Sequence, residues 1–377
     1  MKKKPKKVFV GLSGGVDSSV SAYLLKKQGY DVVGVHLRCW NVGGCDVNEA
    51  EYARRGAEHL GIPFYLFNLE REYKKAVVDY MIDGYKKGVT PNPDVMCNKE
   101  IKFGLFLKKA LEMGADFVAT GHYVRLRRNL KFKISNFKLE IARDLNKDQS
   151  YFLWTLTQEQ LKRSLFPLGN LTKPEVRKIA KKIGLPNADK KDSQGICFIG
   201  EVPIKDFLGK YIKERQGKII DETGNVLGRH DGAVFYTIGQ RHGLKIGGSD
   251  MPYYVKDKDV KKNLLIVAKG EDNPSLFKKE IKLANVNIID QSTPSLISAK
   301  GGQARLPASG GDGRIDEIRV FARVRYRQPL FKARLIYPST GSGFRLVFDK
   351  AQKFIAPGQS AVFYSKKGEM LGGGIII

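Results

Sequence analysis

The sequence has little cysteine and no long apolar run. Its 377 residues contain four cysteines, too few for the disulfide framework that stabilises small secreted domains. No stretch of about 18 apolar residues is present, so we expect no membrane-spanning helix. The basic amino terminus precedes only a short apolar stretch, residues 8–12, and offers neither a secretory signal nor the arginines of a mitochondrial transit peptide. These absences predict a cytoplasmic protein with no membrane partner.

Acidic residues are also in short supply. The chain has 66 Lys and Arg against 39 Asp and Glu, which leaves a net charge of +27. Such a surface attracts polyanions, and RNA or DNA is the first candidate. The alternative is a lysine-rich composition that spreads charge over the surface without a specific partner, and charge alone leaves both interpretations open.

Strand and helix patterns alternate over the first third of the chain. Short apolar runs typical of buried parallel strands lie at residues 8–12, 31–37, 64–69 and 117–120. Helical patterns follow these runs at residues 18–28, 49–60, 70–86 and 101–113. This order predicts an α/β fold with a doubly wound parallel sheet, in which ligands bind at the carboxyl ends of the strands.

The pattern changes after residue 123. We expect a hairpin over residues 124–142, helices over 158–165 and 173–183, and short strands with glycine turns from residue 217. From residue 281, five or six alternating segments predict a C-terminal β-barrel after a small β-rich central domain. A Gly- and Ser-rich insertion lies within the predicted barrel at residues 295–313. The predicted domains are residues 1–205, 206–275 and 276–377.

The most specific motif is S-G-G-V-D-S-S at residues 13–19, directly between a predicted strand and a predicted helix. Its glycines let backbone N–H groups approach an anion, and the helix amino terminus adds partial positive charge. The motif lacks the lysine of the kinase and GTPase phosphate loop, and it is not the dinucleotide-binding G-x-G-x-x-G. A serine-capped helix after a glycine turn is the structural alternative to a phosphate site.

Two cysteines stand in distinctive surroundings. Cys97 follows N-P-D at residues 92–94, and the two prolines of this stretch predict a rigid, non-helical approach to a helix that starts near the cysteine. The helix amino terminus, Lys99 and Lys102 should lower the pKa of the Cys97 thiol. Cys197 lies between glycines. Either cysteine alone is as well explained by packing. The C-x5-C spacing of Cys39 and Cys45 does not match a zinc pair.

Taken together, the motifs carry a family resemblance. S-G-G-x-D-S resembles the PP-loop of ATP pyrophosphatases, which cleave ATP between the α and β phosphates. With N-P-D-x-x-C-N and G-x-C-F-I-G, the chain resembles the tRNA-specific 2-thiouridylase (MnmA/TrmU) family over nearly its whole length. The stretches at residues 121–123, 147–153 and 325–328 fit the same family in the same order.

The resemblance implies a PP-loop fold and ATP-dependent 2-thiolation of the wobble uridine (position 34) of tRNA. ATP, with Mg2+, would activate the C2 oxygen as an AMP ester, and sulfur would come from a persulfide on Cys197, directly or as hydrosulfide released by Cys97. The products would be 2-thiouridine, AMP and pyrophosphate, with Cys97 and Cys197 left as a disulfide. A sulfur-relay protein or cysteine desulfurase would load Cys197, and the tRNAs for Lys, Glu and Gln would be the substrates.

The resemblance also assigns residues. The catalytic residues would be Cys97, Cys197 and Asp94, the last as a base toward N3 of the uracil or a hydrogen-bond partner. The residues implied to bind ATP are Gly11, Leu12, Ser13, Gly14, Gly15, Val16, Asp17, Ser18, Leu37 and Gly121. Those implied to contact tRNA are Asn92, Pro93, Asp94, Lys147, Asp148, Gln149, Arg325 and Tyr326. No resident metal is expected.

Other interpretations stay open at this point. The chain is alternatively another PP-loop enzyme that adenylates a small carboxylate or a different RNA base, or a non-catalytic RNA-binding protein. An iron–sulfur cluster on Cys97 and Cys197, with Asp94 as a third ligand, is a minority interpretation of the same site.

Arginines recur at alternate positions near the carboxyl end of the chain. Arg319, Arg323, Arg325 and Arg327 would share one face of a continuous strand. Because the planar guanidinium suits phosphate, this pattern predicts an RNA-contacting face. A solvated barrel face is the alternative.

Overall fold

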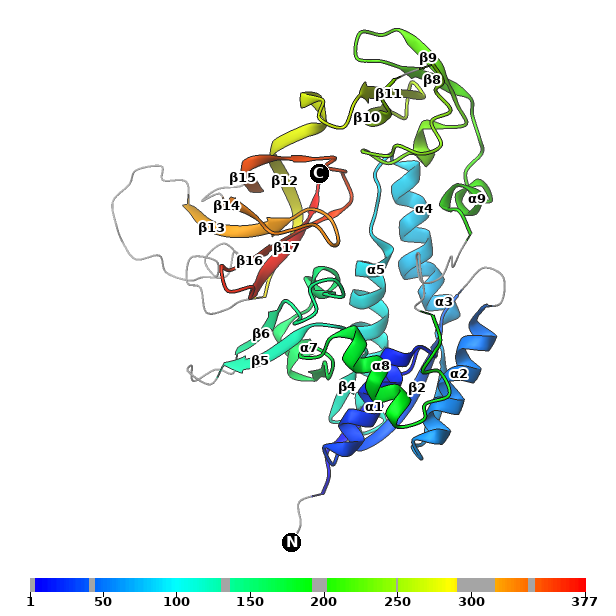
Figure 1. Cartoon of the computed structure of the whole chain (residues 1–377), viewed down its shortest axis with the longest axis vertical. Coiled ribbons are helices and arrows are strands. Elements are labelled where there is room, and N and C mark those ends of the chain that lie inside the picture. The colour runs from blue at the N-terminus through cyan, green and yellow to red at the C-terminus, as the bar shows by residue number, and fades with distance from the viewer. Residues whose placement is uncertain are drawn as a thin grey trace.

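The computed structural model describes residues 4–40, 45–129, 136–191, 202–248, 250–289, 316–337 and 343–377. It consists of an α/β unit, a small sheet and a barrel, with the barrel beside the other two (Figure 1). Within those ranges no helix combines the length and the apolar character needed to cross a bilayer.

The α/β unit is built on a five-stranded parallel sheet of order β3-β2-β1-β4-β7. The strands are β1 (Lys7–Gly11), β2 (Asp31–Arg38), β3 (Phe64–Asn68), β4 (Phe117–Ala119) and β7 (Ser164–Leu165). This sheet confirms the predicted doubly wound fold. The fifth strand was missed, because two residues at the end of a helical pattern carry no strand period.

The α/β unit also contains helices. They are α1 (Val16–Lys27), α2 (Cys45–His59), α3 (Glu70–Tyr73), α4 (Asp79–Lys86), α5 (Pro93–Met96), α6 (Phe106–Glu112), α7 (Gln158–Lys162) and α8 (Lys173–Lys182). Most of them lie near the parallel sheet, whereas α4 extends toward the small sheet (Figure 1). Two π-helical stretches, η1 (Lys74–Val78) and η2 (Cys97–Leu105), interrupt otherwise continuous helices. The helix predicted at residues 101–113 therefore begins earlier, at Pro93, and passes through the π stretch that contains Cys97. Such π-helical stretches are rare in proteins, and those that do occur often lie at functional sites.

The remaining elements confirm the predicted hairpin, β-rich region and barrel. β5 (Arg125–Asn129) pairs with β6 (Asn136–Glu140), and α9 (Ile204–Gly209) precedes a sheet of order β10-β11-β8-β9. The strands of that sheet are β8 (Gly217–Ile220), β9 (Val226–His230), β10 (Tyr253–Asp259) and β11 (Leu264–Lys269). The closed barrel contains β12 (Phe277–Ile288), β13 (Asp316–Arg323), β14 (Phe331–Tyr337), β15 (Phe344–Lys353), β16 (Ser360–Tyr364) and β17 (Met370–Ile376). Short 3-10 turns lie at η3 (Ser150–Leu153), η4 (Ala233–Phe235) and η5 (Pro274–Leu276). The 295–313 insertion lies outside the described residues.

The predicted four-arginine face is wrong. Strand β13 ends at Arg323, so Arg325 and Arg327 lie in the turn that follows, where Arg327 has a φ of +63°. Arg319 is exposed, whereas Arg323 is only 5% exposed. Alternation in the sequence predicted one continuous strand, but the chain turns after Arg323 and the barrel packs against the α/β unit at that point.

Candidate active site

The phosphate-loop motif lies between β1 and α1 and is held by hydrogen bonds among its own residues. Gly15 is the N-cap of α1, and Gly14 has a left-handed φ of +77°. The Ser18 hydroxyl donates to the Gly15 carbonyl at 3.0 Å and accepts from the Ser13 amide at 3.2 Å. The serines of the motif therefore shape the loop, and the exposed Ser13 side chain lies at its outer edge.

Two glycines make this loop a close-fitting cradle. A Cβ on Gly14 would lie 2.5 Å from the Glu49 carbonyl oxygen, and a Cβ on Gly121 would lie 2.9 Å from the Ser18 amide nitrogen. Both distances are shorter than a side chain tolerates, so only glycine fits. The loop that these glycines pack leads into the amino terminus of α1, and backbone N–H groups at such a terminus suit the phosphates of ATP.

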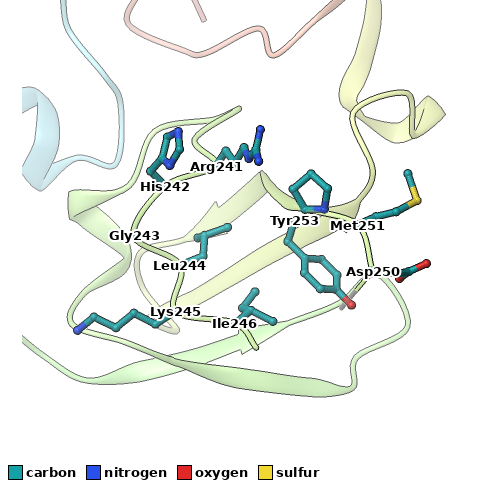
Figure 2. A pocket seen from close by; sticks show the side chains of 10 residues that line it. Arg241, His242, Gly243, Leu244, Lys245, Ile246, Asp250, Met251 and Tyr253 are labelled. Atoms are coloured by element: carbon teal, nitrogen blue, oxygen red, sulfur yellow. The ribbon is translucent and has the colours of Figure 1, made fainter. Parts of the chain in front are cut away.

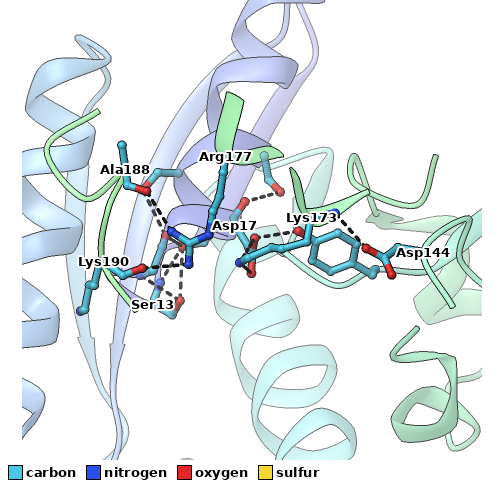
Figure 3. Close-up of polar contacts among 12 residues, drawn as sticks. Ser13, Asp17, Asp144, Lys173, Arg177, Ala188 and Lys190 are labelled. Atoms are coloured by element: carbon cyan, nitrogen blue, oxygen red, sulfur yellow. Dashed lines mark hydrogen bonds and ion pairs between the residues drawn. The ribbon is translucent and has the colours of Figure 1, made fainter. Parts of the chain in front are cut away.

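Asp17 of the motif is held from two sides. The Lys173 ammonium lies 2.7 and 2.8 Å from its two carboxylate oxygens, and the Tyr123 hydroxyl donates to it at 2.8 Å (Figure 3). Lys173 is the first residue of α8, lies 156 positions away in the sequence and is 8% exposed. The loop thus lacks a lysine of its own but receives one from a distant helix. The Thr172/Glu175 capping box signals the start of that helix, but nothing in the sequence signals its target.

The chain that follows α8 is also tied to the phosphate loop. The Asn187 amide donates to the Gly14 carbonyl and to the Ser19 hydroxyl, both at 3.0 Å. The Lys190 ammonium lies 2.7 Å from a Glu49 carboxylate oxygen. Arg177 donates to the carbonyls of Ala188 and Lys190 in the same cluster (Figure 3). Cys197 and its G-x-C-F-I-G motif lie outside the described residues.

The residues expected to bind ATP come together at the carboxyl edge of the sheet. Gly11 ends β1, Leu37 lies near the end of β2, and Gly121 follows β4, so these positions belong to three neighbouring strands. The Leu12 amide donates to the Val35 carbonyl at 2.8 Å and fixes the loop against β2. Their binding of ATP stays a prediction.

The N-P-D segment differs in one respect from the expected rigid approach. Pro93 is itself the first residue of α5, and the Asn92 side chain caps that helix by accepting from the Val95 amide at 3.2 Å. Proline suits this position, because its missing N–H would have no helical partner there. Cys97 is therefore inside the helix and 4% exposed. The predicted lowering of the Cys97 pKa stays a prediction.

Three titratable groups lie around this helix. Burial raises the pKa of Asp94 above its ordinary value, and the positive charge of Lys102 opposes that shift. Burial also lowers the pKa of His122 well below its ordinary value, and Lys102 lowers it further. His122, whose Nδ1 lies 2.7 Å from the Thr120 hydroxyl, is therefore neutral, and Asp94 is a stronger base than an exposed carboxylate.

Comparison with known proteins identifies the family. A tRNA-specific 2-thiouridylase MnmA from Geobacillus kaustophilus is 45% identical over 98% of this chain and 94% of its own length. The corresponding protein of Bacillus subtilis is 44% identical over all of this chain and 96% of its own length. The chain belongs to the tRNA-specific 2-thiouridylase MnmA family.

Family models divide this MnmA-family chain into three segments. They are described as a tRNA methyl transferase HUP domain, matching residues 6–201, a tRNA methyl transferase PRC-barrel domain, matching 205–269, and an aminomethyltransferase β-barrel domain, matching 310–376. The domain boundaries expected near residues 205 and 275 are retained as a proposal.

The residues that the MnmA resemblance assigns to tRNA surround the junction of the three parts. Arg325 donates to the carbonyls of Ile238, at 3.1 Å, and Phe354, at 2.6 Å. The ring of Tyr326 lies 4.5 Å from that of Phe152. Asp148 is 3% exposed, which leaves Lys147 and Gln149 as the more accessible side chains of their loop.

A hollow of about 350 Å³ lies at this junction. Arg325, Tyr326 and Gln359 of the barrel side line it together with residues 237–240. Gln359 donates to the Thr90 and Pro91 carbonyls at 2.8 and 3.3 Å, so the hollow adjoins the segment that leads to Asp94. A larger hollow of about 460 Å³ in the central region is lined by Arg241, His242, Lys245 and Tyr253 (Figure 2). None of the predicted site residues lines that second hollow.

The described residues contain no group of three or more His, Cys, Asp or Glu side chains arranged to hold a metal ion. Asp17 and Glu49, the carboxylates beside the phosphate loop, each pair with a lysine instead.

Proposed function

We propose that this chain is an ATP-dependent tRNA-uridine 2-sulfurtransferase that converts the wobble uridine of tRNA to 2-thiouridine, with AMP and pyrophosphate as the other products. The observation that carries the proposal is a phosphate cradle at the same sheet edge as the Asp94–Cys97 helix in an MnmA-family chain. Leu37, at the end of β2, packs against the hydrophobic cluster that contains Cys97. This contact supports the proposal that nucleotide and thiol chemistry occur at neighbouring positions.

The first step is activation. The C2 oxygen of uridine attacks the α-phosphorus of ATP, and pyrophosphate leaves with the bonding electron pair. The residues around Gly14 and Gly121 hold the phosphates, and Asp94, whose pKa is raised by burial, accepts the N3 proton of the uracil. Oxygen at C2, a poor leaving group, becomes part of AMP, a good one.

The second step is sulfur delivery. The terminal sulfur of a Cys197 persulfide attacks C2, and AMP departs with the former uridine oxygen. The Cys97 thiolate then attacks the Cys197 sulfur, so the bond between the two persulfide sulfurs breaks and a Cys97–Cys197 disulfide forms. External thiols reduce that disulfide, and a cysteine desulfurase or a sulfur-relay protein reloads Cys197. Covalent delivery replaces one difficult substitution by easier steps.

Two variants test the assignment. Cys97→Ser and Cys197→Ser should each abolish 2-thiouridine in digests of tRNA for Lys, Glu or Gln treated with ATP, Mg2+ and a persulfide donor. Both variants should still bind ATP, because the proposal gives neither thiol a role in holding the nucleotide. Full activity of Cys197→Ser with the persulfide donor would contradict the delivery step.

The same digest, together with an assay of released pyrophosphate, separates the other candidate functions. The matching family models are described in terms of methyl transfer; a methylated nucleoside formed without ATP would support that chemistry. Pyrophosphate release without tRNA would instead favour a PP-loop enzyme that adenylates a small carboxylate. Neither alternative makes use of the raised basicity of Asp94 beside a buried cysteine.

A further inference from the structure

A buried ion pair joins the barrel to the α/β unit. The Arg323 guanidinium of β13 donates to the Asp148 carboxylate, and the two side chains are only 6% and 2% exposed. The residues are 175 positions apart in the sequence. A buried charge pair of this kind is costly unless every partner is satisfied, so its other contacts decide what it does.

Every acceptor position of Asp148 is used within the protein. One carboxylate oxygen accepts from the Ala142 amide at 3.0 Å and the Ser150 amide at 3.2 Å. The other accepts from Arg323 and, at 2.9 Å, from the Ser150 hydroxyl. An RNA group could reach Asp148 only by replacing one of these bonds in a buried site.

Arg323 has one further acceptor on the barrel and one on the α/β unit. Its guanidinium donates to the Tyr364 hydroxyl at 2.7 Å and to the Ser150 hydroxyl at 2.8 Å. Burial by itself lowers the pKa of this guanidinium, but the facing Tyr364 and Asp148 hold it above its ordinary value. Burial raises the pKa of Tyr364 to about 12, so its hydroxyl stays protonated and bonds Ser150 at 3.0 Å.

The pair lies between two of the three segments that the family resemblance assigns to tRNA. Asp148 separates Lys147 from Gln149, and Gln149 is itself fixed by accepting from the Tyr123 amide at 3.1 Å. Two residues beyond Arg323, Arg325 and Tyr326 line the junction hollow, and Tyr326 packs on Phe152 of the turn that begins at Ser150. Moving the pair therefore moves both segments.

We propose that Asp148 and Arg323 form an interdomain latch that positions these two segments for tRNA, and that Asp148 is a positioning residue rather than an RNA contact. This proposal rests on the proposed function, because that function gives the 147–149 loop and the turn after Arg323 a common substrate, tRNA. Neither Asp148 nor Arg323 bonds the phosphate loop directly, so we expect the latch to act mainly on tRNA affinity; Tyr123, which bonds both Gln149 and Asp17, links the two places.

The test is a double-mutant cycle with Asp148→Asn, Arg323→Met and the double variant, read by tRNA binding, ATP binding and thermal unfolding. Each single variant strands a buried polar or charged partner and should lower both stability and tRNA affinity, the latter by about tenfold, a typical size for coupling between sites. The double variant removes both charges, so its stability should recover while its tRNA affinity stays low. ATP affinity should fall less than tRNA affinity throughout, because neither Asp148 nor Arg323 bonds the phosphate loop directly and the link between them runs through Tyr123.

Other outcomes overturn the latch. If tRNA affinity recovers with stability in the double variant, the pair is only structural. If Arg323→Lys keeps stability and Asp148→Asn alone loses affinity, Asp148 contacts RNA directly. Arg327→Met supplies the profile of a direct contact: this exposed arginine lies on the same turn, and its loss should lower the salt slope of tRNA binding by about 1 without changing stability. Failure of the parent protein to bind tRNA would count against the proposed function instead.

Discussion

The phosphate loop and the domain junction are built in opposite ways. The loop is a contiguous motif, with Ser13, Gly15 and Ser18 bonded to one another within a few residues. The junction brings together groups from distant parts of the chain, such as Asp148 and Arg323. A site made from one stretch tolerates no change in its own backbone, whereas a site made from several depends on the contacts between its parts.

The largest effect that sharpens this comparison is expected at Gly14. Gly14→Ala adds a Cβ that would lie 2.5 Å from the Glu49 carbonyl oxygen, in a left-handed conformation. A displacement near 1 Å at a reacting centre can cost about a hundredfold, so ATP binding and pyrophosphate release should fall by at least that factor. Isothermal titration with ATP and a pyrophosphate assay measure both.

Gly29→Ala is the matched control for that variant. Gly29 has a φ of +87°, but no atom lies within 4 Å of the position of its Cβ. It therefore carries the same left-handed strain, about 1–2 kcal/mol, without the clash. If Gly29→Ala weakened ATP binding as much as Gly14→Ala, backbone strain and not the close fit of the cradle would explain the effect.

Removing the distant lysine tests whether the loop is as self-contained as its sequence suggests. Lys173→Met leaves Asp17 without its cation and should cost about 1–3 kcal/mol of folding stability, less than a fully buried pair because the Asp17 side chain is 32% exposed. If ATP binding loses about 1.4 kcal/mol of this free energy as well, ATP affinity should fall by about tenfold. Thermal unfolding and ATP titration measure the two quantities.

Lys181→Met, on the same helix, is its control. Lys181 pairs with an exposed Asp189, and such a surface pair contributes about 0–1 kcal/mol. Equal losses in the two variants would mean that α8, and not the Asp17 contact, responds to the substitution.

A smaller effect is expected from pH at Asp94. Because burial raises its pKa, the folded protein binds this proton more tightly than the unfolded chain, so the stability linked to Asp94 decreases as pH rises through the interval between the two pKa values. The rate of adenylation should change with pH in the opposite direction, because Asp94 must be ionised to act as a base. The rate should fall as pH decreases through the raised pKa of Asp94.

Asp94→Asn separates these two consequences. The variant should react much more slowly, and its single-turnover rate should no longer fall toward acidic pH. Its melting temperature, compared with that of the parent protein at the same pH, should be more favourable at pH 8 than at pH 5. An unchanged acidic limb in this variant would assign that limb to another group.

Sequence reasoning reached the contiguous features and missed the distributed ones. The parallel sheet, the phosphate loop and the barrel followed from local periods and from one motif. Lys173 was not foreseen, because a helix start does not reveal what its side chain faces. The arginine pattern misled, because alternation does not show where a strand ends. Nothing in the sequence signals that Asp148 pairs with Arg323, 175 positions away.

One measurement tests the central claim most directly. A tRNA whose wobble uridine carries heavy oxygen at C2 is incubated with the protein, ATP, Mg2+ and a persulfide donor. The mass of the AMP that is then isolated is measured by mass spectrometry. The account predicts one heavy oxygen in AMP for each 2-thiouridine formed. Formation of 2-thiouridine with AMP free of the label would contradict it, because the uridine oxygen would then have left without ever being joined to the nucleotide.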